Sequence, residues 1–200
     1  MPASVAAELK DRGEATPMQY EMVSVLFTDF VNFTKYAEQV SHSELVQELN
    51  TIFLSFDEII SKHRMEKIKT IGDSYMCAGG LPQANTTNAH DAVSAAIEML
   101  EFTRKHNASA ASGKNLEIRI GVNTGRVVAG VIGKSKFAYD IWGDDVNIAA
   151  RMEQSGESGK INISGSTYQY VKDQFKCSFR GMVDAKNKGK IEMYFVEGRI

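Results

Sequence analysis

The stretch Glu21-Met-Val-Ser-Val-Leu-Phe-Thr-Asp-Phe30 is an apolar run that ends in an aspartate, Asp29. We expect Glu21 to Thr28 to form a buried strand. A second aspartate, Asp73, follows another strand-like run in the same way. Both carboxylates should therefore lie at a strand end or turn, within reach of a ligand. Two such groups can hold two divalent cations on a polyphosphate, but an aspartate at a turn is more often a turn residue.

The composition is that of one soluble globular domain. The 200 residues are 43% hydrophobic and 24% charged. The net charge of -2 argues against non-specific nucleic-acid binding, which needs a basic face. No apolar run reaches the length of a membrane span, and no signal-peptide pattern opens the chain. We therefore expect no membrane insertion of this segment and a cytoplasmic location, either by itself or as part of a larger, membrane-bound protein.

Residues 1–20 are polar and are predicted to be a lead-in or linker segment with a short helix from Ser4 to Arg12. Such a lead-in suggests an upstream sensor or regulatory domain. Residues 21–200 are predicted to form one catalytic domain. Its strands are expected at 21–28, 65–70, 74–78, 116–122, 127–132, 175–183 and 191–196, and its helices at 41–60, 88–106 and 145–154.

The expected fold class is α+β. Strand, helix, hairpin, helix and strand follow one another in the βαββαβ order of ferredoxin-like domains. Extra strands and helices follow this core, and the sheet should be rich in antiparallel pairs. Within it, residues 123–126 are predicted to be a turn between two strands, and residues 108–114 a loop.

Four segments become specific when they are taken together: Val25-Leu-Phe-Thr-Asp-Phe-Val-Asn-Phe-Thr34, Glu66-Lys-Ile-Lys-Thr-Ile-Gly-Asp-Ser-Tyr-Met76, Arg119-Ile-Gly-Val-Asn-Thr-Gly-Arg-Val-Val-Ala-Gly-Val-Ile-Gly133 and Tyr139-Asp-Ile-Trp-Gly-Asp-Asp-Val-Asn-Ile-Ala-Ala-Arg-Met152. In this order and at this spacing the chain resembles the class III nucleotidyl cyclase catalytic domain, over about residues 21–197. The resemblance implies a head-to-tail homodimer, with active sites at the interface between the two chains.

The resemblance also implies which residues bind metal. Asp29 and Asp73 match the family's metal-binding carboxylates, and the backbone carbonyl of Phe30 completes one metal shell. Two Mg2+ or Mn2+ ions per site are implied. They would bridge the nucleotide phosphates, lower the pKa of the ribose 3′-hydroxyl and stabilise the leaving pyrophosphate.

Base choice is readable from two positions of the family pattern. Lys69 and Asp140 match the residues that face the purine in adenylyl cyclases, whereas guanylyl cyclases carry Glu and Cys there. A lysine donates to adenine N1, and a carboxylate accepts from the N6 amine. Guanine presents the opposite pattern, so the resemblance implies ATP as substrate and cyclic AMP as product. The plainer interpretation of Lys69 is a solvated charge beside Lys67.

The remaining predicted contacts to the nucleotide also come from the resemblance. Asn147 and Arg151, four residues apart on one helix face, match the pair that orients the ribose and stabilises the α-phosphate. Arg126 and Lys186 match phosphate-contacting residues. The turn after the first strand is expected to cradle phosphates with its backbone amides; it consists of Phe30, Val31, Asn32, Phe33 and Thr34.

Three residues depart from the family pattern. Asn32 stands where Gly is usual, and Asn tolerates a positive φ better than most residues. Asn187 interrupts the usual Lys-Gly-Lys-Gly near the last strands. Asp145 replaces a usual Thr, and either weakens nucleotide binding by its charge or caps the helix.

Three other functions are weighed against the adenylyl cyclase. A guanylyl cyclase is disfavoured by Lys69 and Asp140. A non-catalytic cyclase-homology module that dimerises or regulates a partner usually lacks an aspartate, the Asn or the Arg, and all of these are present here. A diguanylate cyclase would carry a Gly-Gly-acidic-Glu-Phe signature, which the sequence lacks.

Overall fold

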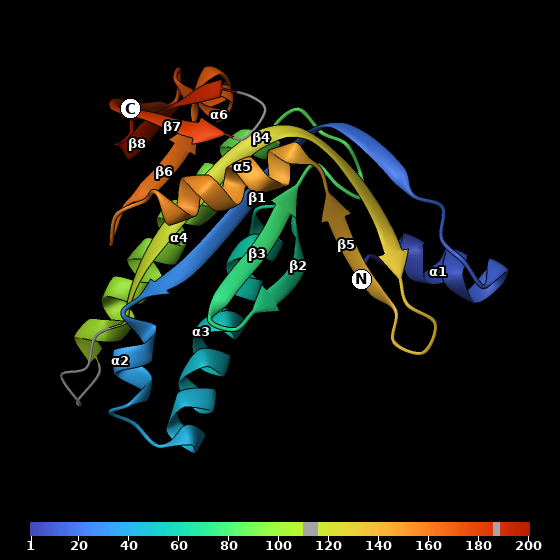
Figure 1. Ribbon diagram of the computed structural model, residues 1–200, viewed down its shortest axis with the longest axis horizontal. Coiled ribbons are helices and arrows are strands. Elements are labelled where there is room, and N and C mark those ends of the chain that lie inside the picture. Colours follow the sequence, from blue (N-terminus) through green and yellow to red (C-terminus); the bar gives the residue numbers. More distant parts are fainter. Residues whose placement is uncertain (110–115, 186–188) are drawn as a thin grey trace.

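The computed structural model describes residues 1–109, 116–185 and 189–200. Figure 1 shows the elements in chain order: α1 (Ala3–Arg12), β1 (Met18–Val31), α2 (Phe33–Ala37), α3 (His42–Lys62), β2 (Met65–Ile71), β3 (Ser74–Gly79), α4 (Asn88–Ser109), β4 (Glu117–Ile132), β5 (Ala138–Trp142), α5 (Asp144–Gln154), β6 (Ile161–Ser164), α6 (Gly165–Val171), β7 (Phe175–Ala185) and β8 (Gly189–Arg199). In the described residues the eight strands form one sheet in the order β2-β3-β1-β4-β6-β8-β7, with β5 paired to β4 beside this path.

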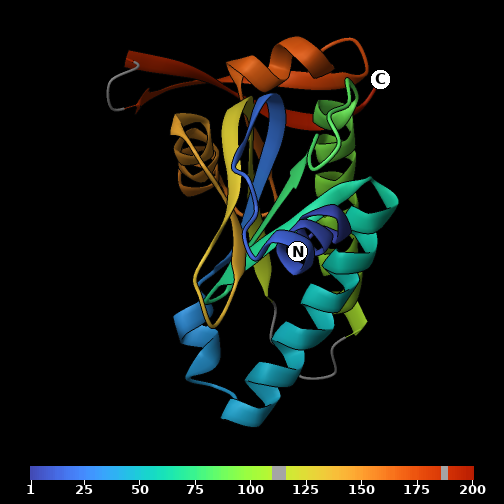
Figure 2. The same cartoon turned by 90° about the vertical axis from the view of Figure 1, so that its right-hand side faces the viewer.

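The sheet lies between two helical layers. Figure 2 shows it nearly edge-on, with α5 on one side and α3 and α4 on the other. One buried cluster, which includes Leu26 and Phe56, fills the side of α3 and α4. A second cluster, which includes Val25, Phe27 and Ala149, fills the side of α5. Because both faces of β1 are covered, residues 23–28 are all buried and do not alternate between buried and exposed positions.

The predicted βαββαβ core is confirmed. Strands β2, β3, β1 and β4 are neighbours in that order, and each neighbouring pair is antiparallel. Gly72, at φ 62°, opens the two-residue turn between β2 and β3. Ser41 caps α3 through a capping box with Glu44. The extra C-terminal elements are also present, and the parallel pair of β4 and β6 makes the sheet mixed.

The predicted turn at residues 123–126 is wrong. These residues continue β4, and Asn123, Thr124 and Gly125 pair with β1 in antiparallel register. Asn123 and Thr124 are buried, and each makes side-chain hydrogen bonds inside the sheet. Polar residues that usually mark turns are therefore used here for buried contacts, which a single sequence does not reveal.

Several boundaries also differ from the expectation. Strand β1 begins at Met18, inside the expected lead-in, and α4 continues to Ser109. The loop expected at 108–114 lies largely outside the described residues. The short elements α2, β5, β6 and α6 were not predicted. Among the described helices, none is long and apolar enough to cross a membrane.

Helix α5 lies along β4, and each end of the helix rests on a glycine of the strand. A Cβ atom at Gly121 would lie 2.0 Å from the backbone N of Glu153, and one at Gly125 would lie 2.2 Å from Cγ of Asp145. Helix residues 145 to 153 advance by about 12 Å, and strand residues 121 to 125 span about 13 Å. The matching lengths allow both ends of α5 to approach the strand closely.

We expect Gly121→Ala to lower the free energy of unfolding by about 3 kcal/mol, because the new methyl group would overlap backbone atoms of α5. Urea denaturation measures this change. Gly130→Ala on the same strand is the control, since its Cβ would meet Trp142 at an ordinary 3.4 Å. Equal losses from the two substitutions would contradict the close helix–strand contact.

Candidate active site

Asp29 lies near the end of β1, with both carboxylate oxygens hydrogen-bonded. Oδ1 accepts from the Ser74 hydroxyl at 2.7 Å, and Oδ2 accepts from Nη2 of Arg119 at 2.8 Å. Ser74 directly follows Asp73, which occupies the turn between β2 and β3. The structure therefore brings the two predicted metal-binding aspartates to the same end of neighbouring strands.

The two aspartates also influence each other electrostatically. Burial raises the pKa of the Asp73 carboxyl above its ordinary value, and the negative charge of Asp29 raises it further. Hydrogen bonds from the backbone N–H groups of Asp73 and Phe30 and the positive charge of Arg119 act in the opposite direction. A divalent cation beside these carboxylates would relieve their mutual repulsion.

The donor set suits Mg2+ or Mn2+. Asp29, Asp73 and the backbone carbonyl of Phe30 offer hard oxygen ligands, which these ions prefer. Within residues 1–109, 116–185 and 189–200 there is no group of three or more His, Cys, Asp or Glu side chains placed to hold one metal ion. The remaining ligands would have to be nucleotide oxygens and water, as is common for Mg2+.

Arg119 was missed by the sequence reasoning. It lies directly across from Asp29 in the β1–β4 pairing, and its guanidinium contacts both Asp29 and Glu153. Burial lowers the pKa of Arg119, but the nearby Glu153 and Asp29 carboxylates outweigh this and raise it. Burial raises the pKa of Glu153, and this outweighs the positive charge of Arg119, which lowers it. The cross-strand register would have been the only signal for this contact, and it is not visible in one sequence.

Lys69 and Asp140 form an ion pair although they are 71 residues apart. Nζ of Lys69 lies 2.5 Å from Oδ2 of Asp140, so the pair joins β2 to β5. Lys67 instead contacts Asp57 of α3 at 2.9 Å. A shift in the β2–β3 register between Lys67 and Lys69 turns the two lysines to opposite faces of the sheet. The interpretation of Lys69 as one member of a solvated lysine pair is therefore not supported.

Asn147 and Arg151 lie on α5, as predicted. Asn147 is exposed, and Arg151 is half-buried and donates from Nη1 to the backbone carbonyl of Asp184 on β7 at 3.1 Å. Arg126 lies within β4 and not in a hairpin turn, and its exposed side chain pairs with Glu21 at 3.0 Å. Lys186 and Asn187 lie outside the described residues.

The turn expected at residues 30–34 is shorter than expected, because Phe30 and Val31 still belong to β1 and Phe33 already begins α2. Asn32 has φ 60° and ψ 28°, so it occupies the left-handed region in which the family usually places Gly. Phe33 and Thr34 begin the short helix α2, and Phe33 packs against the buried cluster that contains Phe30. Asparagine therefore serves this turn without breaking it.

The comparisons with known proteins agree on the family. A family model described as "Adenylate and Guanylate cyclase catalytic domain" matches residues 15–198. The chain belongs to the class III nucleotidyl cyclases. An adenylate cyclase of Mycobacterium tuberculosis is 36% identical over 200 residues, which are all of this chain and 45% of that protein. The cyclase domain described here thus spans less than half of that relative.

Guanylate cyclases are equally similar to this cyclase domain. The receptor-type guanylate cyclase gcy-4 of Caenorhabditis briggsae is 37% identical over 205 residues, which cover all of this chain and 18% of the relative. A solved catalytic core of a rhodopsin-guanylyl cyclase with converted specificity, in complex with ATPαS, has a TM-score of 0.86 and 37% identity. It covers 92% of this chain and 98% of its own. The comparisons therefore do not decide between ATP and GTP.

We expect Arg119→Met to destabilise the cyclase domain by about 2 kcal/mol at pH 8, because Glu153 loses its counter-charge in a buried position; the figure is reduced for the partial exposure of Arg119. The pKa of Glu153 is already raised in the folded protein, so the folded state of the variant gains protons more readily than the unfolded chain. The loss in free energy of unfolding that Arg119→Met causes should therefore become smaller as the pH falls from 8 to 5. Urea denaturation at both pH values measures it.

The double variant Arg119→Met with Glu153→Gln is the control. It removes both charges, so it should recover part of the stability lost by Arg119→Met alone. Losses that simply add, or a deficit that grows on acidification, would contradict the ion pair as the source of the effect.

Proposed function

We propose that this cyclase domain is an adenylyl cyclase, which converts ATP to 3′,5′-cyclic AMP and pyrophosphate. The ribose 3′-hydroxyl would attack the α-phosphate in line with the leaving pyrophosphate, at the interface of a homodimer. The observation that carries the proposal is the contact between Lys69 and Asp140. It presents one donor and one acceptor side by side on neighbouring parts of the sheet.

This pair of side chains complements adenine. The ammonium group of Lys69 can donate to N1, and the carboxylate of Asp140 can accept from the N6 amine. Guanine has a carbonyl at C6 and a proton on N1, so it would leave both side chains facing groups of the wrong kind. Each unpaired buried polar group costs about 1–3 kcal/mol, which is enough to reject an isosteric base.

A guanylyl cyclase is the second candidate, because relatives of that activity are as similar to the chain as the adenylate cyclases are. One solved relative is itself a guanylyl cyclase with converted specificity. Base preference in this fold can therefore change while the scaffold stays the same. This favours an argument from individual residues over one from overall similarity.

The other roles follow from the chemistry of the side chains. Members of the family typically use two divalent metal ions. Asp29, Asp73 and the carbonyl of Phe30 would hold them, and the ions would supply Lewis-acid stabilisation of the phosphates. Asn147 would orient the ribose, and Arg151 would stabilise charge that develops on the α-phosphate.

The phosphates need further positive or N–H groups. Arg126 and Lys186 would contact them as cations, and the segment at residues 30–34, where β1 passes into α2, would offer backbone amides. The exposed ion pair of Arg126 with Glu21 is weak in water, so it leaves the guanidinium free to exchange partners.

A shared site in a homodimer explains why the predicted groups are separated within one chain. Among the described residues, hydrogen bonds and ion pairs join Asp29 to Ser74 and Arg119, and join Lys69 to Asp140, without linking the two groups. A head-to-tail arrangement would bring the carboxylates of one protomer to the base-reading pair of the other.

We expect the purified domain to form cyclic AMP from ATP in the presence of Mn2+ and to discriminate strongly against GTP. The double variant Lys69→Glu with Asp140→Cys should lose ATP activity and gain GTP activity, because it reverses the donor and acceptor facing the base. Two mismatched contacts of about 1–3 kcal/mol each would shift the preference by tens to thousands of fold. Product separation after incubation with each nucleotide measures this.

Lys67→Glu is the matched control, since Lys67 faces α3 and should not change the base preference. The adenylyl assignment fails if the unsubstituted domain turns over GTP as well as ATP. The role of the pair fails if the double variant keeps its preference for ATP.

We also expect two inactive variants to restore each other. Asp73→Ala removes a carboxylate from one half-site, and Asn147→Ala removes the ribose contact from the other. A heterodimer of the two would contain one intact site, so mixing should recover activity in proportion to the heterodimer measured by native mass spectrometry. Each variant incubated alone is the control. Confirmed heterodimers without activity would refute the shared site.

A further inference from the structure

Six buried polar side chains form a continuous row across the sheet. Each is at most 1% exposed, and together they lead from the first residue of α4 to the start of α5: Asn88, Ser24, Thr124, Thr167, Ser164 and Asn123. Neighbours in the row are 2.6 to 3.2 Å apart. Buried polar groups are costly unless they are hydrogen-bonded, so a complete row of this kind has a structural purpose.

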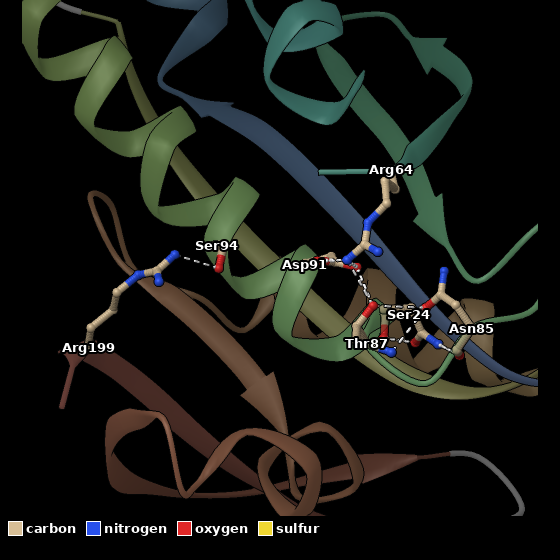
Figure 3. A network of polar contacts seen from close by, with 8 residues as sticks. Ser24, Arg64, Asn85, Thr87, Asp91, Ser94 and Arg199 are labelled. Carbon is tan, nitrogen blue, oxygen red and sulfur yellow. Dashed lines mark hydrogen bonds and ion pairs between the residues drawn. The ribbon is translucent and has the colours of Figure 1, made fainter. Parts of the chain in front are cut away.

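The row is anchored at α4. Nδ2 of Asn88 donates to the backbone carbonyls of Met22 and Asn85, so its Oδ1 is the acceptor for the Ser24 hydroxyl at 2.7 Å. Figure 3 shows Ser24 and Asn85 at the start of α4, beside the exposed ion pair of Arg64 with Asp91. The amide orientation of Asn88 is thereby set by its partners, and the first strand is tied to the helix.

The other end of the row reaches Asp145. The Ser164 hydroxyl donates to Oδ1 of Asn123 at 2.6 Å, so Nδ2 of Asn123 points to α5. There it donates to the backbone carbonyl of Asp145 at 2.9 Å and to its carboxylate at 3.2 Å. The second carboxylate oxygen accepts from the backbone N–H of Arg126 at 3.0 Å. Both oxygens of Asp145 are therefore bound by β4.

These contacts take the place of the side-chain N-cap that usually holds the first turn of a helix. The N-cap residue of α5 is Gly143, which has no side chain to cap the helix. Asp145, in the first turn, instead holds α5 to β4 and fits over Gly125, where any Cβ would collide with it. The sequence suggested that Asp145 either caps the helix or weakens nucleotide binding by its charge. In the structure Asp145 is not the N-cap, and its carboxylate accepts hydrogen bonds from N–H donors of β4.

The position of this contact matters for the nucleotide site. Asn147 and Arg151 lie two and six residues after Asp145 on the same helix. A helix transmits a displacement of its first turn to the side chains beyond it, and a misplacement of about 1 Å at a catalytic group can cost about 100-fold in rate. A small shift of α5 along β4 would thus move both residues together.

We propose that Asn123 and Asp145 are a positioning pair that sets α5, and with it Asn147 and Arg151, on β4, and that the buried row fixes the Asn123 amide from behind. The inference rests on the proposed roles of Asn147 and Arg151 in the cyclase reaction. It assigns no contact with the nucleotide to Asp145. The pair acts through hydrogen bonds and shape, and not through the charge of the carboxylate.

Two substitutions at one position separate hydrogen bonding from charge. Asp145→Ala removes both acceptors and should lower kcat for ATP by about 10- to 100-fold, with KM within about threefold. Asp145→Asn removes the charge but keeps an acceptor for the Arg126 N–H, while Asn123 still donates to the backbone carbonyl of residue 145. It should stay within about threefold of the unsubstituted enzyme. An equal loss in both variants would overturn the proposal.

The coupling between the two residues is tested next. If they act as one unit, Asn123→Ala combined with Asp145→Ala should cost about as much in kcat as the worse single change. Multiplied losses would overturn the pair. Asn123→Ala leaves Ser164 without its acceptor and can impair folding, so the decisive variant is Asp145→Ala, whose site is only half-buried.

Amide hydrogen exchange gives a readout without catalysis. Asp145→Ala should speed exchange in the first turn of α5 by at least about tenfold and leave α3 unchanged, whereas Asp145→Asn should change neither. Unchanged exchange in α5 of Asp145→Ala would overturn the positioning role. If the unsubstituted protein forms no cyclic nucleotide, the proposed function fails, while the exchange measurement still decides the positioning role.

Discussion

The antiparallel pairing of β1 with β4 is the constraint on which the rest of the molecule depends. It runs almost the full length of both strands, from Met18 opposite Ala129 to Val31 opposite Glu117. This register puts Arg119 across from Asp29 and Thr124 across from Ser24. The candidate metal site and the buried polar row are therefore two consequences of one alignment. A slip by one residue would turn every side chain of a strand to the opposite face and destroy both.

The same pairing explains how α5 reaches its place. The helix needs a strand surface that it can approach closely at two points, and Gly121 and Gly125 provide them. At one end Glu153 meets Arg119, and at the other Asp145 meets Asn123. The helix that carries Asn147 and Arg151 is thus connected to Asp29 through Arg119 within a single chain. This gives a physical route by which the state of the carboxylate site can affect the helix.

The sequence predicted the parts of the fold that have strong local signals. The amphipathic pattern after Ser41 and the Gly72-Asp73 turn were enough to place α3 and the β2–β3 hairpin. The prediction failed at residues 123–126, where Asn, Thr and Gly serve buried hydrogen bonds and close packing instead of a turn. Local propensity contains no information about Ser164 or Asp145, which supply the partners. Strands β5 and β6 are short, and their pairing with β4 stabilises them more than their own composition does.

In the candidate site, too, the sequence identified residues that belong to local motifs and missed residues that depend on tertiary contacts. Motif resemblance identified Asp29, Asp73, Lys69, Asp140, Asn147 and Arg151, and the structure adds that Lys69 and Asp140 are in contact. Arg119 and Glu153 could not be found in this way, because their importance lies in a cross-strand register and in burial. The sequence also did not reveal that Asp145, which replaces the usual Thr, holds α5 to β4 through hydrogen bonds to Asn123 and Arg126.

The measurement that tests this account most directly is a crystal structure of the protein with Mn2+ and a non-reactive ATP analogue, with manganese located by anomalous scattering. The account predicts manganese between Asp29 and Asp73 of one protomer, and adenine against Lys69 and Asp140 of its partner, in a head-to-tail dimer. Manganese bound away from both aspartates, or a nucleotide held entirely by one protomer, would contradict it.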